Sequence, residues 1–290
     1  MIRSLALLIA IAPALLAQAK TPPSMDEIAI VSHGARLNAL AYHPAGPGTH
    51  PVVVFLHGFP GNERNLDLAQ SVRRAGYEAL YVDYRGNWGS GGTFSFAHGL
   101  EDVSAILAWV RNPANAAKYH FDTSRIAIVG HSFGGWLMLM SARREPPTTC
   151  MAAMAAWNIG WDGARLATHA DERRDALDYF RSVTDSTGGP IRTSAAALIK
   201  EMSDSAASYN YLSQAAALTS RPLLLVAASH DTPNEDPAMH AQLAAAIRKV
   251  GGKRVEVVNY EDDHPFSAHR SELSDTLVHW LRTTCFPPGR

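Results

Sequence analysis

The chain has 290 residues, of which 47% are hydrophobic and 18% are charged, and its formal net charge is −1. This length and composition allow a sizeable buried core in one or two domains. The near-neutral charge excludes a nucleic-acid-binding protein that depends on a basic stripe, and the absence of repeats, low-complexity tracts and long charge runs excludes a fibrous or repetitive chain.

The first twenty residues, MIRSLALLIAIAPALLAQAK, have the pattern of a targeting segment. Arg3 precedes an apolar run that is too short to span a bilayer, and the sequence AQA at 17–19 fits a small-x-small cleavage site. We expect residues 1–19 to be a secretory signal peptide, and the protein to be exported to the periplasm or secreted. The alternative is an N-terminal amphipathic helix or membrane anchor. After cleavage we expect one domain over residues 20–290 without stable membrane insertion.

Strand and helix patterns then alternate with short connections. Continuous apolar runs such as VVVFLHG are typical of strands that are buried on both faces. The expected elements in chain order are two short antiparallel strands around a turn at Gly34, a strand at 52–58, a helix at 63–75, a strand at 78–85, a helix at 99–112, a strand at 125–130, a helix at 134–144, strands at 150–157 and 222–231, a helix at 236–252, a strand at 254–260 and a helix at 271–283. The alternation predicts an α/β fold with a mostly parallel central sheet and helices on both faces.

Residues 158–218 interrupt this alternation. They contain helical stretches rich in Asp, Glu and Arg and a turn cluster, DSTGGP, but no strong strand pattern. An insertion of about sixty residues between two strands is long for a simple connection. We therefore expect a helical cap over one edge of the sheet.

The sequence Gly130-His131-Ser132-Phe133-Gly134 fits the pattern G-x-S-x-G. A predicted strand ends at its first glycine and a predicted helix starts just after the serine, which is the context of a nucleophile elbow. In such a turn the glycines remove side chains that would clash, and the hydroxyl stands at the carboxyl edge of the sheet, where ligands bind. A phosphate-binding loop is the alternative, but neither G-x-x-x-x-G-K-[ST] nor G-x-G-x-x-G is present. Ser132 is the predicted nucleophile.

A serine nucleophile needs a base, and the base needs a carboxylate that orients it. In this architecture the chain order is Ser, then Asp or Glu, then His. Asp231 ends one predicted strand and His264 follows the next strand by four residues, so both belong at the same edge as Ser132. Glu235 and Asp236 are rival acids, although they suit the N-terminus of the next helix better. We predict Ser132, Asp231 and His264 as the catalytic triad.

Other titratable residues near these positions receive structural interpretations. His230 should point away from the site, on the opposite side of the strand from the predicted acid, and His269 should begin the last helix. Glu261, Asp262 and Asp263 have the pattern of a solvated acidic loop, although they are also candidates for favouring the charged imidazole.

Acyl transfer also needs hydrogen-bond donors for the oxyanion. One should be the backbone N–H of Phe133, the residue after the nucleophile. The loop HGFPG, which follows the strand at 52–58, should supply the other through the N–H of Phe59. His57 in this loop is a candidate second base or metal ligand, but one histidine without partners is weak support for a metal, and we expect its ring to hold the loop by hydrogen bonds. No metal or organic cofactor is required.

The segments HGFPG, DYRGNWGSGG and GHSFGG, with the loops of Asp231 and His264, resemble the α/β-hydrolase superfamily in order and spacing. They are most similar to serine hydrolases related to dienelactone hydrolases and to the catalytic domain of prolyl oligopeptidase-type peptidases. The resemblance covers roughly residues 28–285 and is weakest in the insertion. It implies the same triad and the same two oxyanion donors. Epoxide hydrolases and haloalkane dehalogenases share the HGFP element, but they use an aspartate where this chain has Ser132.

The expected fold places both cysteines at the edge of the sheet opposite the site. Cys150 opens a predicted strand and Cys285 ends the last predicted helix. In an exported protein the two are candidates for one disulfide; two buried free thiols are the alternative.

These residues predict an exported serine hydrolase that cleaves a carboxylic ester. A peptidase or amidase that acts on short peptides would use the same mechanism, and a non-catalytic binding protein on the same scaffold is the remaining alternative. Aromatic side chains are candidates for an acyl pocket, although such residues more often serve packing. They are Trp88, Trp136, Trp157 and Trp161.

Overall fold

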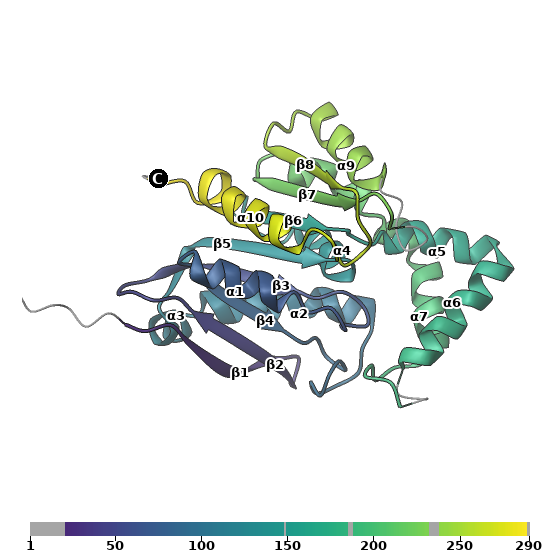
Figure 1. The fold of residues 1–290 in the computed structure, drawn as a ribbon. Helices are drawn as coiled ribbons and strands as arrows, with labels where there is room; N and C mark the ends of the chain where they lie inside the picture. Colours follow the sequence, from purple (N-terminus) through teal and green to yellow (C-terminus); the bar gives the residue numbers. More distant parts are fainter. Residues whose placement is uncertain (1–20, 148, 185–187, 232–237, 289–290) are drawn as a thin grey trace, which may run out of the picture.

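An eight-stranded sheet forms the centre of the protein in the computed structural model, which describes residues 21–147, 149–184, 188–231 and 238–288 (Figure 1). The predicted signal peptide lies outside these residues. The strands are β1 (Ser24–Ser32), β2 (Ala35–His43), β3 (His50–Leu56), β4 (Glu78–Val82), β5 (Phe121–His131), β6 (Cys150–Met154), β7 (Leu223–Ala228) and β8 (Val255–Tyr260). They are ordered β1-β2-β4-β3-β5-β6-β7-β8. β2 pairs antiparallel with β1 and β4, and all other neighbours are parallel.

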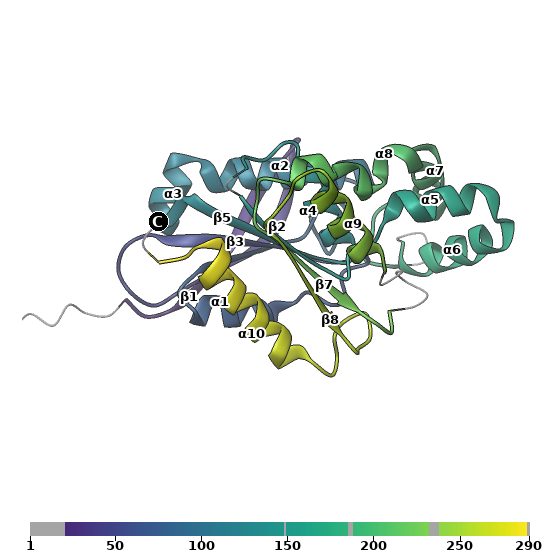
Figure 2. The same cartoon turned by 90° about the horizontal axis from the view of Figure 1, so that it is seen from above.

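Helices cover both faces of the sheet (Figure 2). They are α1 (Leu66–Arg74), α2 (Phe96–Arg111), α3 (Pro113–Tyr119), α4 (Phe133–Ser141), α9 (Ala238–Lys249), α10 (Arg270–Trp280) and the short π-helix η3 (Leu281–Cys285). α1 and α10 pack on one face, while α2, α4 and α9 pack on the other, and each face has its own buried apolar cluster. The predicted α/β architecture is confirmed. Within the described residues, no helix is both long and apolar enough to cross a bilayer.

Two local features differ from the sequence prediction. Helix α3 was not expected, although its start carries a capping signal: the side chain of Asn112 accepts hydrogen bonds from the N–H groups of Ala114 and Asn115, and Pro113 occupies the first helical position. The strand expected at 150–157 is shorter than predicted. β6 ends at its fifth residue because the next residue, Ala155, has a φ of 43°, which breaks the extended backbone.

The insertion between β6 and β7 consists of helices joined by loops. These are α5 (Ile159–Thr168), α6 (Ala170–Val183), α7 (Ala195–Asp204), α8 (Ala206–Tyr209) and the 3₁₀-helix η2 (Tyr211–Leu218). α5, α6 and α7 project beyond the carboxyl ends of the parallel strands (Figure 1). The carboxylate of Glu201 in α7 accepts from the N–H groups of Phe96 and Ala97 at 3.0 and 2.7 Å, and Arg192 donates to the carbonyls of Ser90 and Gly92. These bonds fix the helical cap to the N-terminus of α2 and to the loop that precedes it.

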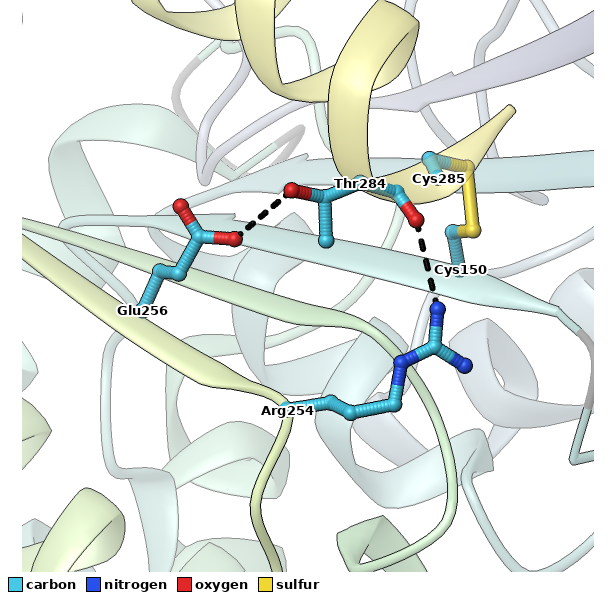
Figure 3. The surroundings of a disulfide bond; sticks show 5 residues. All are labelled: Cys150, Arg254, Glu256, Thr284 and Cys285. Atoms are coloured by element: carbon cyan, nitrogen blue, oxygen red, sulfur yellow. Dashed lines mark hydrogen bonds between the residues drawn. A yellow bond between two sulfur atoms is a disulfide. The ribbon is translucent and has the colours of Figure 1, made fainter. Parts of the chain in front are cut away.

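A disulfide joins Cys150 to Cys285 (Figure 3). It connects the first residue of β6 to the last residue of η3, at the edge of the sheet opposite the cap. Beside it, Thr284 accepts a hydrogen bond from Arg254 through its carbonyl and donates one to Glu256 through its hydroxyl, at 3.2 and 2.9 Å. The bond spans a sequence separation of 135 residues, for which the chain-entropy relation gives about 4–5 kcal/mol of stabilisation. The C-terminal helix is thus covalently tied to the sheet.

Candidate active site

The predicted nucleophile forms the turn between a strand and a helix. β5 ends at His131 and α4 begins at Phe133, so Ser132 alone makes the turn, with φ 53° and ψ −117°. This backbone conformation costs a residue other than glycine about 1–3 kcal/mol and is concentrated at functional sites. The Ser132 N–H donates to the carbonyl of Met154, and the Ser132 carbonyl accepts from the N–H of Trp157. The strained turn is therefore held by hydrogen bonds to the end of β6 and the residues that follow it.

Glycines allow the backbone to pack tightly around this turn. A Cβ atom on Gly134 would lie 1.9 Å from the carbonyl oxygen of Leu56, and one on Gly130 would lie 2.2 Å from the carbonyl oxygen of Gly134. Both separations are far shorter than a van der Waals contact. The G-x-S-x-G pattern is thus required because α4 starts directly against the end of β3.

The predicted base and acid are joined by a hydrogen bond. Nδ1 of His264 lies 2.7 Å from both carboxylate oxygens of Asp231, whose side chain is 1% exposed. Because a carboxylate can only accept, Nδ1 carries the proton and Nε2 is left as an acceptor. Asp231 follows β7 by three residues and His264 follows β8 by four, so two adjacent strands bring the pair together.

This pair lies beside the strand-to-helix turn. The ring centroid of His264 is 4.7 Å from that of His131, the residue before Ser132. Among the residues that the structure describes, no hydrogen bond involves the Ser132 hydroxyl. Serine–histidine hydrogen bonds often tighten only when a substrate is bound. The rival acids Glu235 and Asp236 lie outside the described residues.

Two backbone donors are available next to the serine. A Cβ atom on Gly58 would lie 3.1 Å from Cβ of Ser132, so the HGFPG loop passes directly beside the turn. Phe133 is the first residue of α4, where N–H groups have no partner within the helix. In the described part of the chain, neither the N–H of Phe133 nor that of Phe59 donates a hydrogen bond to the protein. Both N–H groups are therefore candidates for the oxyanion donors.

Hydrogen bonds fix the HGFPG loop. Nδ1 of His57 donates to the carbonyl of Gly58 at 2.6 Å, the hydroxyl of Tyr84 donates to the carbonyl of His57 at 2.9 Å, and the indole N–H of Trp88 donates to the carbonyl of Pro60 at 2.8 Å. Burial lowers the pKa of His57 to about 4, so its ring is neutral at pH 7. Among the described residues, no group of three or more His, Cys, Asp or Glu side chains could hold a metal ion. The hydrogen bonds of the His57 ring and of its carbonyl hold the loop.

The loop that carries His264, called the base loop below, differs from the sequence prediction at one residue. Asp262 was expected in a solvated acidic loop, but it is only 5% exposed. Its carboxylate accepts from the N–H groups of Ala268 and His269, from Nδ1 of His269 and from the N–H of Asp263. The loop that carries His264 is thus folded around this buried carboxylate. The expected exposure was wrong because the following residues bend back to bind the side chain.

Aromatic side chains connect the cap to the site. The ring of Phe59 lies 5.5 Å from that of Phe180 in α6, and the ring of Trp157 lies 6.5 Å from Phe180. Trp157 therefore connects the cap to the strand-to-helix turn, because its backbone N–H also donates to the carbonyl of Ser132 at 3.1 Å. Trp136, by contrast, is fully buried and its indole N–H donates to the carbonyl of Tyr209, so it serves packing.

Comparisons with known proteins agree with this architecture. A sequence model of the X-Pro dipeptidyl-peptidase (S15) family matches residues 33–266. The chain is 34% identical over 128 residues to 2-succinyl-6-hydroxy-2,4-cyclohexadiene-1-carboxylate synthase from Escherichia coli (44% of this chain, 46% of that protein). It is 33% identical over 146 residues to the carboxylesterase NlhH of Mycobacterium tuberculosis (46% and 44%). The matched region thus spans less than half the length of these curated relatives.

Solved structures show the same fold at low sequence identity. The esterase Pf2001 of Pyrococcus furiosus superposes with a TM-score of 0.65 at 17% identity and covers 89% of this chain and 90% of its own. The esterase Est1E of Butyrivibrio proteoclasticus gives a TM-score of 0.61 at 17% identity, with 88% of this chain and 97% of its own covered. The chain therefore has the fold shared by these esterases.

Proposed function

The chain belongs to the X-Pro dipeptidyl-peptidase (S15) family within the α/β-hydrolase superfamily, and from the geometry of its site we propose that it is a serine hydrolase that cleaves carboxylic esters. Ser132 is the nucleophile, His264 the general base and acid, and Asp231 the carboxylate that orients the base. The backbone N–H groups of Phe59 and Phe133 stabilise the oxyanion.

The reaction proceeds in two steps. The hydroxyl of Ser132 attacks the ester carbonyl while Nε2 of His264 takes its proton, and the tetrahedral oxyanion is bound by the two backbone N–H groups. The protonated imidazole then gives its proton to the leaving alcohol, which leaves an acyl group on the serine. Water, deprotonated by the same imidazole, attacks the acyl carbonyl and releases the acid. Asp231 stays ionised and stabilises the imidazolium in both steps.

One observation carries this proposal: Nδ1 of His264 is hydrogen-bonded at 2.7 Å to a buried carboxylate, and its ring lies beside the turn that bears Ser132. A binding protein does not need an imidazole oriented by a buried carboxylate beside a strained serine. The combination matches the requirements of acyl transfer.

The family match also favours a second candidate function, cleavage of a peptide bond. The S15 family is named for X-Pro dipeptidyl-peptidases, which favours a peptide substrate. The similarity to a carboxylesterase and to the structures of two esterases favours an ester substrate. The chemistry of the triad serves both substrates. The two substrates differ in the leaving group. An amine leaves less readily than an alcohol and must be protonated as it leaves.

A direct comparison of substrates tests the proposal. We expect p-nitrophenyl esters of short acyl chains to be hydrolysed with a higher kcat/KM than an X-Pro p-nitroanilide when each value is divided by the rate of uncatalysed hydrolysis of that substrate, and we expect the acyl length of the best ester to report the size of the acyl pocket. Hydrolysis should fall by a factor of about 10⁴–10⁶ in Ser132→Ala. A higher kcat/KM for the anilide would establish the peptidase instead. No turnover of either substrate, together with no labelling by a fluorophosphonate, would favour the non-catalytic binding protein.

We further propose that the protein is exported, since residues 1–19 have a signal-peptide pattern and disulfides such as Cys150–Cys285 persist in oxidising compartments. After expression of the full chain, intact-mass analysis of the envelope and secreted fractions should give a protein that begins at Lys20 and has no free thiol. Recovery of the full chain from the reducing cytoplasm, with both thiols free, would contradict this proposal.

A further inference from the structure

His131, the residue before the nucleophile, is a buried histidine that the proposed mechanism does not use. It is the last residue of β5 and is 3% exposed. A buried polar side chain normally has a structural or functional reason for its position, because leaving it unpaired costs free energy. Its contacts identify that reason.

The ring of His131 contacts the base loop. Its Nε2 lies 2.9 Å from the backbone carbonyl oxygen of His264, and the two rings are 4.7 Å apart between centroids. Because a carbonyl can only accept, Nε2 of His131 carries the proton and donates it. The ring of Phe266 packs at 6.3 Å and limits rotation of the imidazole. His131 therefore holds the backbone of the base itself.

The other nitrogen of His131 faces the oxyanion loop. Nδ1 is buried and has no hydrogen-bond partner among the residues that the structure describes, and a Cβ atom on Gly58 would lie 3.4 Å from it. The ring thus fills the space between the HGFPG loop and the base loop. Its hydrogen bond is made by Nε2, to the carbonyl of His264 in the base loop.

The environment keeps this ring neutral. Burial lowers the pKa of His131 to about 3, and the nearby His264, Arg270 and His57 oppose a positive charge further. A neutral ring is the form compatible with the mechanism, since a second imidazolium at this position would repel the positive charge that develops on His264.

We propose that His131 is a positioning residue that fixes the distance between base and nucleophile by holding the backbone carbonyl of His264. This inference rests on the proposed function. His264 is then held at two points: its ring by Asp231, and its backbone by His131. His131 and Ser132 are consecutive residues. The hydrogen bond from His131 to the carbonyl of His264 therefore limits how far the base can move from the nucleophile.

Matched variants test the hydrogen bond. The amide N–H₂ of His131→Gln reaches the position of Nε2, whereas the amide of His131→Asn reaches only the position of Nδ1, and His131→Leu has no donor. On p-nitrophenyl acetate we expect kcat to fall about 10- to 100-fold in the Leu and Asn variants, the range caused by small misplacements of catalytic groups, with KM nearly unchanged. We expect His131→Gln to recover most of the lost kcat. Equal activity in the Gln and Asn variants would overturn the inference, and this comparison stands even if the Leu variant does not fold.

A second measurement separates positioning from a general structural role. In a His264→Ala background the carbonyl at position 264 is still present, but there is no base to position. The residual rate, which comes from the oxyanion donors and binding, should change less than about twofold when His131→Leu is added. An equal loss in both backgrounds would show that His131 supports the fold or the oxyanion loop instead, and would overturn the inference.

The same assay distinguishes the failure of this inference from the failure of the proposed function. Full activity in Ser132→Ala would overturn the triad and the role of His131 together. Loss of activity in Ser132→Ala and His264→Ala, with full activity in all three His131 variants, would overturn the role of His131 alone.

Discussion

The Ser132→Ala protein is expected to lose a factor of about 10⁴–10⁶ in kcat on p-nitrophenyl esters while it folds normally, in line with the effect of removing a nucleophile in other serine hydrolases. Alanine keeps the Cβ atom, so the positive φ at this turn imposes no additional strain. The remaining rate should come from the oxyanion donors acting on direct attack by water. Steady-state kinetics with a thermal melting curve of each protein measure both properties.

Ser141 provides a matched control on the same helix. It is also buried, and its hydroxyl donates to the carbonyl of Met138 at 2.8 Å, at the end of α4 remote from Ser132. We expect Ser141→Ala to reduce the free energy of unfolding by about 1 kcal/mol, the typical contribution of one hydrogen bond, and to keep kcat within about twofold. Equal loss of kcat in the two variants, or none in Ser132→Ala, would contradict the assignment of the nucleophile.

The Asp231→Asn protein is expected to lose a factor of about 10³–10⁴ in kcat, a loss that the same exchange causes in a serine protease. The carboxylate now accepts from Nδ1 of His264 at 2.7 Å. An asparagine would present its N–H₂ group to Nδ1 in one orientation, and this favours the tautomer with the proton on Nε2. That tautomer cannot take the proton of Ser132. Because the two side chains have the same size, the fold should be preserved.

Asp263 provides the control, because it is another acidic residue close to His264. Asp263 is exposed, and its carboxylate accepts hydrogen bonds from the N–H and the hydroxyl of Ser267. Asp263→Asn should therefore leave kcat within about twofold of the wild-type value. If Asp231→Asn were as active as Asp263→Asn, the orienting carboxylate would have to be another acid, and Glu235 or Asp236 would be the next residues to substitute.

Local sequence patterns were sufficient to predict the strands, although β6 is shorter than expected, the nucleophile turn and the helices that flank the sheet except α3. Apolar runs such as VVVFLHG formed buried strands because a strand covered on both faces has no polar side. The glycines around Ser132 are recognisable for a similar reason, since a backbone oxygen that lies 1.9 or 2.2 Å from a Cβ position tolerates no other residue. The chain order of Ser132, Asp231 and His264 follows from the ends of those strands.

Contacts made by loop residues were beyond those patterns. The burial of Asp262 depends on residues that bend back to bind its carboxylate, and the position of His131 depends on a hydrogen bond across 133 residues of sequence. Neither leaves a periodicity in the sequence, because each is set by how loops meet at the edge of the finished sheet.

Short segments of sequence specify most of the elements, their order and the chemical groups of the predicted site. Those properties depend on side-chain volume, backbone freedom and hydrophobic period within short segments. Other properties follow only from the folded structure. β7 and β8 are neighbours in the sheet, and Nδ1 of His264 lies 2.7 Å from the carboxylate of Asp231. His131 lies between the HGFPG loop and the loop that carries His264. Such distances arise only when packing, which is cooperative over the whole domain, fixes the loops against one another.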